Sequence, residues 1–403
     1  MAWTPNDAAG AQQAVKDALA QGRTLELLGT GTRRGFGRPV EADEVLDLSA
    51  LKGVVAYQPE ELILAVEPGA PMSEIAAMLT ERGQCLAFEP PDFGPLWGLP
   101  AGLGTIGGAM MTGRGGPRRL TAGGPRDHCL GLKGVNGFGE AFAAGGRVVK
   151  NVTGFDVCKL ATGSFGTLCA ITELTVKVLP APPQAQSLVI RGLSDEAAMA
   201  VMAKALGCPA QVSSAAHLPA DVAARSQVGE LSAAHGAVTL LRVEGVGPSV
   251  TARIAHLSDV LSSETRQAVL DREASQLAWK EIADAAFFVG RDDPVWKLSV
   301  APTSGAAVGR RLADELGGRC FYDWGGGAVW LELPAAPDAH AGRVRQVLAQ
   351  VGEGHATLMR ASSAVRAQVA PFQPLAAGVA ALTERVRAQF DPQRIFNPGR
   401  MYA

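Results

Sequence analysis

Three glycine-rich segments constrain the fold of the N-terminal part of the chain more than any other feature. They read LLGTGTRRGFG (27–37), LPAGLGTIGG (99–108) and TGSFGTL (162–168), and each lies next to an apolar predicted strand. Glycine lets a backbone bend tightly and approach a ligand closely. One such segment is equally well explained as an ordinary glycine-rich turn. Three in one region favour a single large ligand, phosphate-bearing and partly flat, that contacts all of them.

The first segment does not match the common phosphate-binding motifs. Counting from Gly29, the third glycine of G-x-G-x-x-G would fall at position 34, which is Arg34, and the next predicted element is a strand (44–49) rather than a helix. No Gly-Lys-Ser/Thr follows, which argues against a P-loop. The sequence instead predicts that successive backbone N–H groups bind an anion without help from a helix N-terminus. Thr30 and Thr32 add hydroxyl donors, and Arg33 and Arg34 either carry charge toward the anion or face solvent.

Proline-rich PAPPQA (180–185) predicts a boundary between two regions. Before it, apolar strands are expected at 24–29, 62–69 and 167–180, while 98–124 is expected to be an irregular glycine-rich region. After it, residues 296–361 follow the order β-α-β-β-α-β, which is typical of an antiparallel sheet with helices on one face. Residues 188–256 follow a similar, weaker pattern, so two related halves are expected to share one sheet.

The order of the three glycine-rich segments resembles the FAD-binding domain of the vanillyl-alcohol oxidase/p-cresol methylhydroxylase-type (PCMH-type) flavoproteins. FDVCKLATGSFGTLCAITELTVKVLP (155–180) and the C-terminal NPG (397–399) strengthen the resemblance. It implies an α+β fold: a PCMH-type FAD-binding domain of two α+β subdomains, and a cap domain with an antiparallel sheet covered by helices. The expected divisions are 1–180 for the FAD-binding domain, 186–365 for the split-βαβ cap or substrate domain, and 366–403 for a C-terminal segment that returns to the FAD domain.

The resemblance also implies which residues hold the cofactor. Some family members tether FAD covalently through a His or Cys near the first two segments, but this chain has neither residue in 27–37 or in 98–124. Non-covalent FAD is therefore expected. The cofactor-binding residues implied are Gly29, Thr30, Gly31, Thr32, Arg33, Arg34, Gly35, Pro100, Gly102, Leu103, Gly104, Thr105, Gly107, Gly108, Gly163, Ser164, Gly166, Thr167, Ile171 and Asn397.

Within that family the chain most resembles the FAD-binding E subunits of glycolate oxidases. VKNVTGFDVCKL (149–160), GEGHATLMRAS (352–362) and QRIFNPGRMY (393–402) carry this closer likeness. It implies oxidation of glycolate, a 2-hydroxy acid, to glyoxylate, with electrons passed to a partner. The partners implied are a larger FAD-binding subunit and an iron–sulfur subunit. Two alternatives stay open: an accessory, non-catalytic FAD-binding or electron-relay subunit, and a stand-alone FAD-dependent alcohol or alditol oxidase.

Catalytic residues are not assigned by the sequence. Hydride removal from a 2-hydroxy acid requires a base for the hydroxyl proton and a cation for the carboxylate. Basic side chains on predicted cap strands are Arg242, Lys297, His355 and Arg360, and each is also explained as a solvated or structural residue. The loop 113–127 is a solvated loop, a docking surface for an acidic partner, or a rim for an anionic substrate; its arginines are Arg114, Arg118, Arg119 and Arg126.

Composition excludes several other classes. The net charge of -2 and the pI near 6.3 argue against a nucleic-acid-binding protein. Six cysteines without a C-x-x-C pair, and no two of the six histidines within five residues of each other, argue against a metal or iron–sulfur site in this chain. No signal peptide and no transmembrane segment are predicted. A cytoplasmic location is expected, with contact to the inner face of the membrane only through partners.

Overall fold

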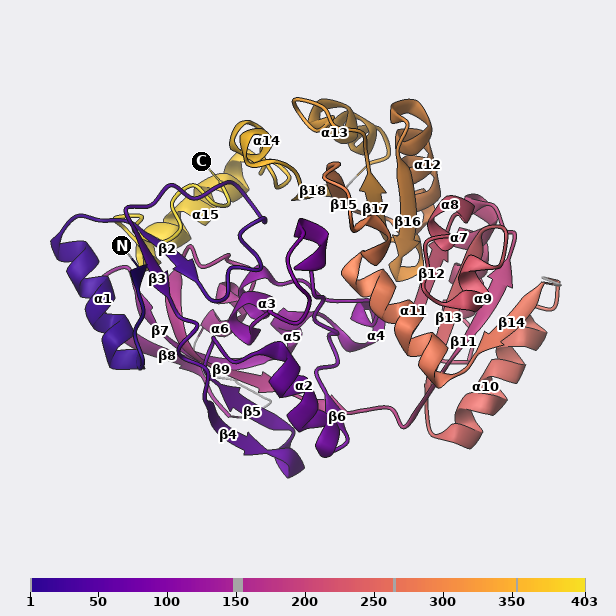
Figure 1. Ribbon diagram of the computed structural model, residues 1–403, viewed down its shortest axis with the longest axis horizontal. Helices are drawn as coiled ribbons and strands as arrows, with labels where there is room; N and C mark the ends of the chain where they lie inside the picture. The colour runs from indigo at the N-terminus through magenta and orange to yellow at the C-terminus, as the bar shows by residue number, and fades with distance from the viewer. Residues whose placement is uncertain (1, 148–154, 264–265, 353, 403) are drawn as a thin grey trace.

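The computed structural model describes residues 2–147, 155–263, 266–352 and 354–402 (Figure 1). Its α+β fold confirms the expected class. The N-terminal part contains two sheets. The smaller has the order β1 (Ala2–Trp3), β3 (Glu44–Asp47) and β2 (Leu25–Leu28), all parallel, and helix α1 (Ala8–Ala20) packs in the same core. The larger is antiparallel, in the order β4 (Val54–Gln58), β5 (Ile63–Val66), β9 (Cys169–Lys177), β7 (Cys129–Asn136) and β8 (Ala141–Gly145).

Strand β9 is the centre of the larger sheet. It pairs with β5 on one side and β7 on the other, so both its edges and most of its side chains are buried. The remaining elements of this part are α2 (Met72–Glu81), β6 (Gln84–Cys85), α3 (Ile106–Thr112), α4 (Arg119–Ala122), α5 (Pro125–His128), α6 (Val157–Ala161) and β10 (Leu179–Pro180).

The eight-stranded sheet confirms the two-halves pattern. Its order is β14-β11-β13-β12-β16-β17-β15-β18, and every neighbouring pair is antiparallel. Each half therefore places its fourth strand beside its first, then its third, then its second, and the halves meet where β12 pairs with β16. The strands are β11 (Gln184–Arg191), β12 (Ser214–Leu218), β13 (Val238–Gly245), β14 (Gln267–Leu270), β15 (Val295–Val300), β16 (Arg319–Asp323), β17 (Ala328–Glu332) and β18 (Gly354–Arg360).

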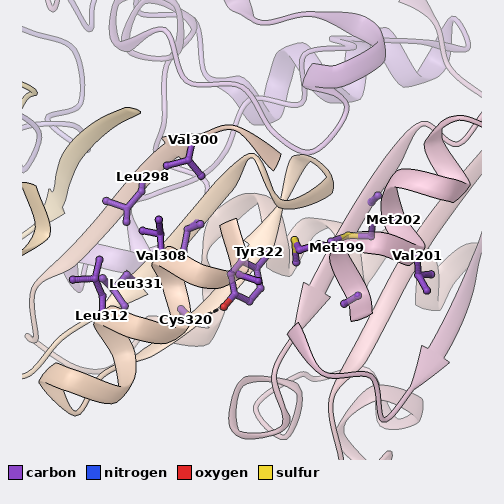
Figure 2. Close-up of a cluster of buried hydrophobic side chains, with 14 of the residues drawn as sticks. Met199, Val201, Met202, Leu298, Val300, Val308, Leu312, Cys320, Tyr322 and Leu331 are labelled. Atoms are coloured by element: carbon purple, nitrogen blue, oxygen red, sulfur yellow. Dashed lines mark hydrogen bonds between the residues drawn. The ribbon is translucent and has the colours of Figure 1, made fainter. Parts of the chain in front are cut away.

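Four helices cover one face of this sheet: α7 (Asp195–Leu206), α10 (Gly247–Val260), α12 (Gly305–Leu316) and α13 (Ala341–Gln350). Figure 2 shows part of the core between them, where Leu298 and Leu331 of the sheet lie near Val308 and Leu312 of α12. Strand alternation sends Trp296 and Leu298 into this core. Lys297, between them, is placed on the opposite face.

The opposite face is also covered, which the sequence pattern did not predict. Helix α11 (Arg272–Asp284) packs on it, together with the short helices α8 (Ala220–Ala223) and α9 (Gly229–Ser232). Aromatic side chains of the N-terminal part fill the rest: Phe93 lies 5.8 Å from the ring of Trp330, and Phe36 and Phe165 belong to the same cluster. The eight-stranded sheet therefore packs directly against the glycine-rich segments.

The C-terminal segment returns to the N-terminal sheet, as Figure 1 shows. After α14 (Ser363–Gln368) and α15 (Ala377–Phe390), the tail runs beside β2, where Leu25 donates a backbone hydrogen bond to Ile395 and Asn397 donates one to Leu25. The expected divisions at 1–180, 186–365 and 366–403 stay a proposal. Within the described ranges, no helix combines the length and the apolar character needed to cross a membrane.

Candidate functional site

The three glycine-rich segments converge on one pocket. The hydroxyl of Thr30 donates to the Leu103 carbonyl at 2.5 Å, which joins the first segment to the second. The pocket has an empty volume of about 720 Å³, its open mouth included. Of the residues that the sequence assigns to the cofactor, it is lined by Gly29, Thr30, Gly31, Thr32, Arg33, Arg34, Thr105, Gly107, Gly108, Gly166, Ile171 and Asn397.

The other assigned residues lie outside this pocket. Gly102 and Gly104 line a neighbouring cavity that shares Thr32 and Arg33 with it, and Gly163 lines a third cavity. Gly35 packs against Trp97, where a Cβ would lie only 2.5 Å from the indole. The rest are Pro100 and Leu103, which are exposed, and Ser164 and Thr167, which are buried in the turn before β9.

The first segment offers backbone donors to the pocket. Among the described residues, the N–H groups of residues 29–33 have no hydrogen-bond partner, whereas those of Arg34 and Phe36 bond to carbonyls within the loop. Gly31 has a φ of 77°, which turns the backbone in a way that other residues rarely adopt. A run of free N–H groups around such a turn suits an anion. This is the arrangement that the sequence predicts for the first segment.

The second segment differs from the expectation. Residues 98–124 are not wholly irregular, because helix α3 begins at Ile106 beside the first segment. Its first N–H groups are already bonded: Ile106 to the Ala70 carbonyl, Gly107 to the Pro68 carbonyl and Gly108 to the Thr105 hydroxyl. The helix therefore contributes a close-packed wall rather than free donors.

Close packing requires glycine at the start of α3. A Cβ on Gly107 would lie 2.7 Å from the Pro68 carbonyl oxygen, a contact that would push the helix away from its neighbour. A Cβ on Gly29 would lie 3.0 Å from the Thr105 hydroxyl. These approaches keep the first segment and the start of α3 in contact along one wall of the pocket.

Buried arginines give the pocket its charge. Arg33 donates to the Pro91 carbonyl at 2.7 Å and to the Thr112 hydroxyl at 3.2 Å, and it forms no ion pair within the described residues. Burial lowers its pKa to about 10. Arg34 differs, because its side chain is paired with both oxygens of Glu26, an interaction that raises the pKa of Arg34. Of the two sequence candidates, Arg33 is therefore the available cation.

Arg400 is a pocket residue that the sequence analysis missed. It donates to the Arg33 carbonyl at 2.7 Å, and burial lowers its pKa to about 10. Its one carboxylate neighbour, Glu26, is 4.0 Å away and already bound to Arg34. Its Nε atom is buried without a partner. Its position in the sequence, directly after the NPG turn, is the signal that could have identified it as a pocket residue.

Asn397 joins three segments behind the pocket. Its side-chain oxygen accepts from the Leu27 N–H at 2.9 Å, and its amide donates to the carbonyls of Phe165 at 2.8 Å and Gly166 at 3.3 Å. The side chain is buried, and all these partners are backbone groups. Asn397 therefore positions the first and third glycine-rich segments, and its own polar atoms are already used.

Two of the cap candidates are structural. Arg242 donates to both oxygens of Glu89, at 2.7 and 2.9 Å, and to the Ser214 hydroxyl. Arg360 donates to Glu332 at 2.9 Å and to three backbone carbonyls. His355 is exposed. None of these three side chains reaches the pocket.

Lys297 does not line the pocket either, but it differs from Arg242 and Arg360 because its side chain has no hydrogen-bonding partner in the part of the chain that the structure describes. It is buried on strand β15, and its Nζ atom has no hydrogen-bond or ion-pair partner within the described residues. The atom lies 4.0 Å from the ring centre of Trp324 and 4.9 Å from that of Trp330. Burial, and then the nearby charge of Arg114, lowers the pKa of Lys297 to about 7. Burial also raises the pKa of the neighbouring Asp323 to about 7.

The four arginines of the loop 113–127 fall into two groups. Arg118 is structural, because it donates to both oxygens of Glu244. Arg114, Arg119 and Arg126 line a cavity with an empty volume of about 840 Å³, its open mouth included, that shares Thr112 and Phe165 with the first pocket. None of these three side chains has a hydrogen bond or an ion pair with another described residue. The interpretation as a rim for an anion therefore fits these three.

Comparisons with known proteins agree with this geometry. A family model described as an FAD binding domain matches residues 1–145. A crystal structure of p-cresol methylhydroxylase with substrate bound superposes with a TM-score of 0.75 at 16% identity, covering 99% of this chain and 88% of that one. Glycolate oxidase subunit GlcE of Escherichia coli (strain K12) is 30% identical over 390 residues, which are 96% of this chain and 95% of that protein. The chain belongs to the vanillyl-alcohol oxidase/p-cresol methylhydroxylase-type FAD-binding flavoproteins.

Membership in this flavoprotein family makes the chain an FAD-dependent oxidoreductase. A shorter match links it to glycolate oxidase subunit GlcD of Bacillus subtilis (strain 168), which is 32% identical over 162 residues, or 40% of this chain and 33% of that protein. The pocket suits FAD chemically. Free N–H groups and buried arginines match a diphosphate, and apolar residues such as Leu48, Met111 and Ile171 match flat rings.

Proposed function

We propose that this chain is the FAD-binding subunit of a glycolate-oxidising enzyme, and that it passes electrons to partner subunits. The single observation that carries the proposal is the likeness to GlcE, which extends over nearly the whole of both chains. The partners proposed are a larger FAD-binding subunit, related to the protein that GlcD represents, and an iron–sulfur subunit. All six cysteines are free and none are spaced as C-x-x-C, so this chain's own sequence offers no usual iron–sulfur ligand set.

FAD, when bound, supplies the hydride acceptor, and the chain supplies binding and charge. The N–H groups of residues 29–33, with Arg33 and Arg400, are proposed to hold the diphosphate. Non-covalent binding is proposed because, among the described residues, the pocket wall contains one cysteine, Cys169, and no histidine. Cys169 is buried in β9, and burial raises its pKa to about 12, so it is a poor nucleophile.

The test uses the purified full chain. Acid precipitation is expected to release the flavin into the supernatant, and flavin retained in the pellet would contradict non-covalent binding. Glycolate added without oxygen is then expected to bleach the flavin's visible absorption band. If the chain binds flavin but glycolate bleaches it only after partner subunits are added, the accessory role is correct instead. Oxygen uptake by the isolated chain with alditols would favour the stand-alone oxidase.

A further inference from the structure

A cluster of unpaired cations lies where the eight-stranded sheet meets the loop 113–127. Arg119 and Lys297 contact the same indole ring: the guanidinium carbon of Arg119 is 5.2 Å from the Trp324 ring centre and the Lys297 Nζ is 4.0 Å from it. The guanidinium carbon of Arg114 lies 5.8 Å from the ring of Phe36 and 6.0 Å from that of Phe165. The three cations are thus held by aromatic faces rather than by carboxylates.

The backbone around Trp324 fixes this arrangement. Trp324 has a φ of 55°, which is rare for an aromatic residue, and the following Gly325 and Gly326 also have positive φ. The indole N–H donates to the Gly116 carbonyl at 3.2 Å, which connects the cap to the loop, and the Trp324 backbone N–H donates to Asp323 at 2.7 Å. Strain of this kind persists where the surrounding structure holds it in place.

Positive charge exceeds negative charge around the cavity. Its cations are Arg114, Arg119 and Arg126, with Lys297 beside them, and the acidic groups near them are Asp127 and Asp323. Asp127 already accepts a hydrogen bond from the Gly124 N–H. Lys297 is buried and Arg114 half-buried, and neither has a carboxylate partner among the described residues. Cations in this state are costly, so their position near the cavity favours an anion as occupant.

We propose that Arg114, Arg119 and Lys297 form a binding site for a small carboxylate anion, and that it is here that the carboxylate of a 2-hydroxy-acid substrate binds. Only the naming of the substrate rests on the proposed function. The anion site itself rests on the unpaired cations, the aromatic residues that hold them and the adjoining cavity. The cavity shares Thr112 and Phe165 with the proposed FAD pocket, so an anion bound here lies close to the cofactor.

The test titrates the full chain with oxalate, a small dicarboxylate that lacks a hydroxyl to oxidise. Binding is followed by calorimetry and by tryptophan fluorescence, because Trp324 and Trp330 contact Lys297. Saturable binding is expected, and glycolamide, which keeps the hydroxyl but has no charge, is expected not to bind. Parent protein that shows no saturable oxalate binding would overturn the proposal.

Variants locate the site. Arg114→Gln and Lys297→Met are expected to raise the Kd for oxalate at least tenfold, and Arg119→Gln severalfold. Arg310→Gln is the matched control: this exposed arginine lies on α12, on the far face of the sheet, and should leave the Kd unchanged. Arg119 is exposed, so its variant tests the site even if Lys297→Met does not fold. Folded variants that bind oxalate like the parent would overturn the proposal.

The outcomes separate this proposal from the proposed function. Suppose that oxalate binding depends on Arg114 and Lys297 but glycolate does not reduce the bound flavin. This result would retain the anion site and reject glycolate oxidation. Reduction of the flavin by glycolate with an unchanged KM in the same variants would retain the function and reject the anion site.

Discussion

Replacing Asn397 by alanine tests whether one side chain holds the pocket together. The change leaves the Leu27 N–H and the Phe165 carbonyl buried without partners. Each unsatisfied buried group costs about 1–3 kcal/mol, so the free energy of unfolding should fall by about 2–6 kcal/mol. Because both freed groups belong to segments that line the pocket, the Kd for FAD should also rise at least tenfold, which corresponds to about 1.4 kcal/mol.

Urea unfolding followed by circular dichroism measures the first effect, and titration of the apoprotein with FAD measures the second. Asn397→Asp should behave similarly, because its carboxylate keeps the acceptor for Leu27 but places oxygen against the carbonyls of Phe165 and Gly166. The control is Asn136→Ala: this side chain also accepts two backbone hydrogen bonds, from Phe138 and Glu140, but in an exposed hairpin turn. Water replaces those bonds, so the loss should stay below about 1 kcal/mol. Asn397→Ala that matches the parent in both assays would refute the reasoning.

Three further predictions concern packing, charge and pH. Gly107→Ala should lower the melting temperature and weaken FAD binding because its Cβ meets Pro68, whereas Gly342→Ala, a helical position with open space, should stabilise the protein by about 0.4–1 kcal/mol. Glu89→Gln removes the carboxylate shared by Arg118 and Arg242 and should cost about 3 kcal/mol in urea unfolding. Arg310→Gln, which breaks an exposed pair with Asp314, should cost under about 0.5 kcal/mol. Burial raises the pKa of Glu281 above 4.5, so the folded state keeps this proton at pH values where the unfolded state has lost it. Stability should therefore fall as pH rises through that range, and unfolding measured across a pH series should show a flatter dependence for Glu281→Gln.

The fold was largely predictable because its signals are local. Strand alternation and the order of elements in 296–361 identify the second half of the large sheet without knowledge of its partners. Helix α3 was missed for a physical reason. It has only seven residues, two of them glycines, and it is stabilised by the Thr105 cap and by carbonyls of Pro68 and Ala70 from a distant segment. Such a helix has little sequence periodicity to detect.

The sequence predicted only the parts of the site that depend on the conformation of the backbone. Glycines that follow strands indicate where the backbone must approach another group closely. The first and second glycine-rich segments are indeed in contact. Which basic residue is available cannot be read from its neighbours in sequence. Arg242 is neutralised by Glu89, a residue 153 positions away, and Arg360 by Glu332. Lys297 also lies on an apolar strand, so its sequence context resembles that of Arg242 and Arg360, but it has no such partner among the described residues.

The cations near Lys297 differ from the other buried cations of the chain in their lack of hydrogen-bonding partners within the described ranges, and this difference indicates a bound ligand. Arg242, Arg360 and the buried Arg366 make several hydrogen bonds each, as a buried guanidinium requires for stability. The same fold leaves the half-buried Arg114, which lines a cavity, and the buried Lys297, whose charge is near that of Arg114, without any among the described residues. Since removing a cation from water without a partner costs several kcal/mol, stability does not explain this pair. A bound anion that supplies the missing partner does.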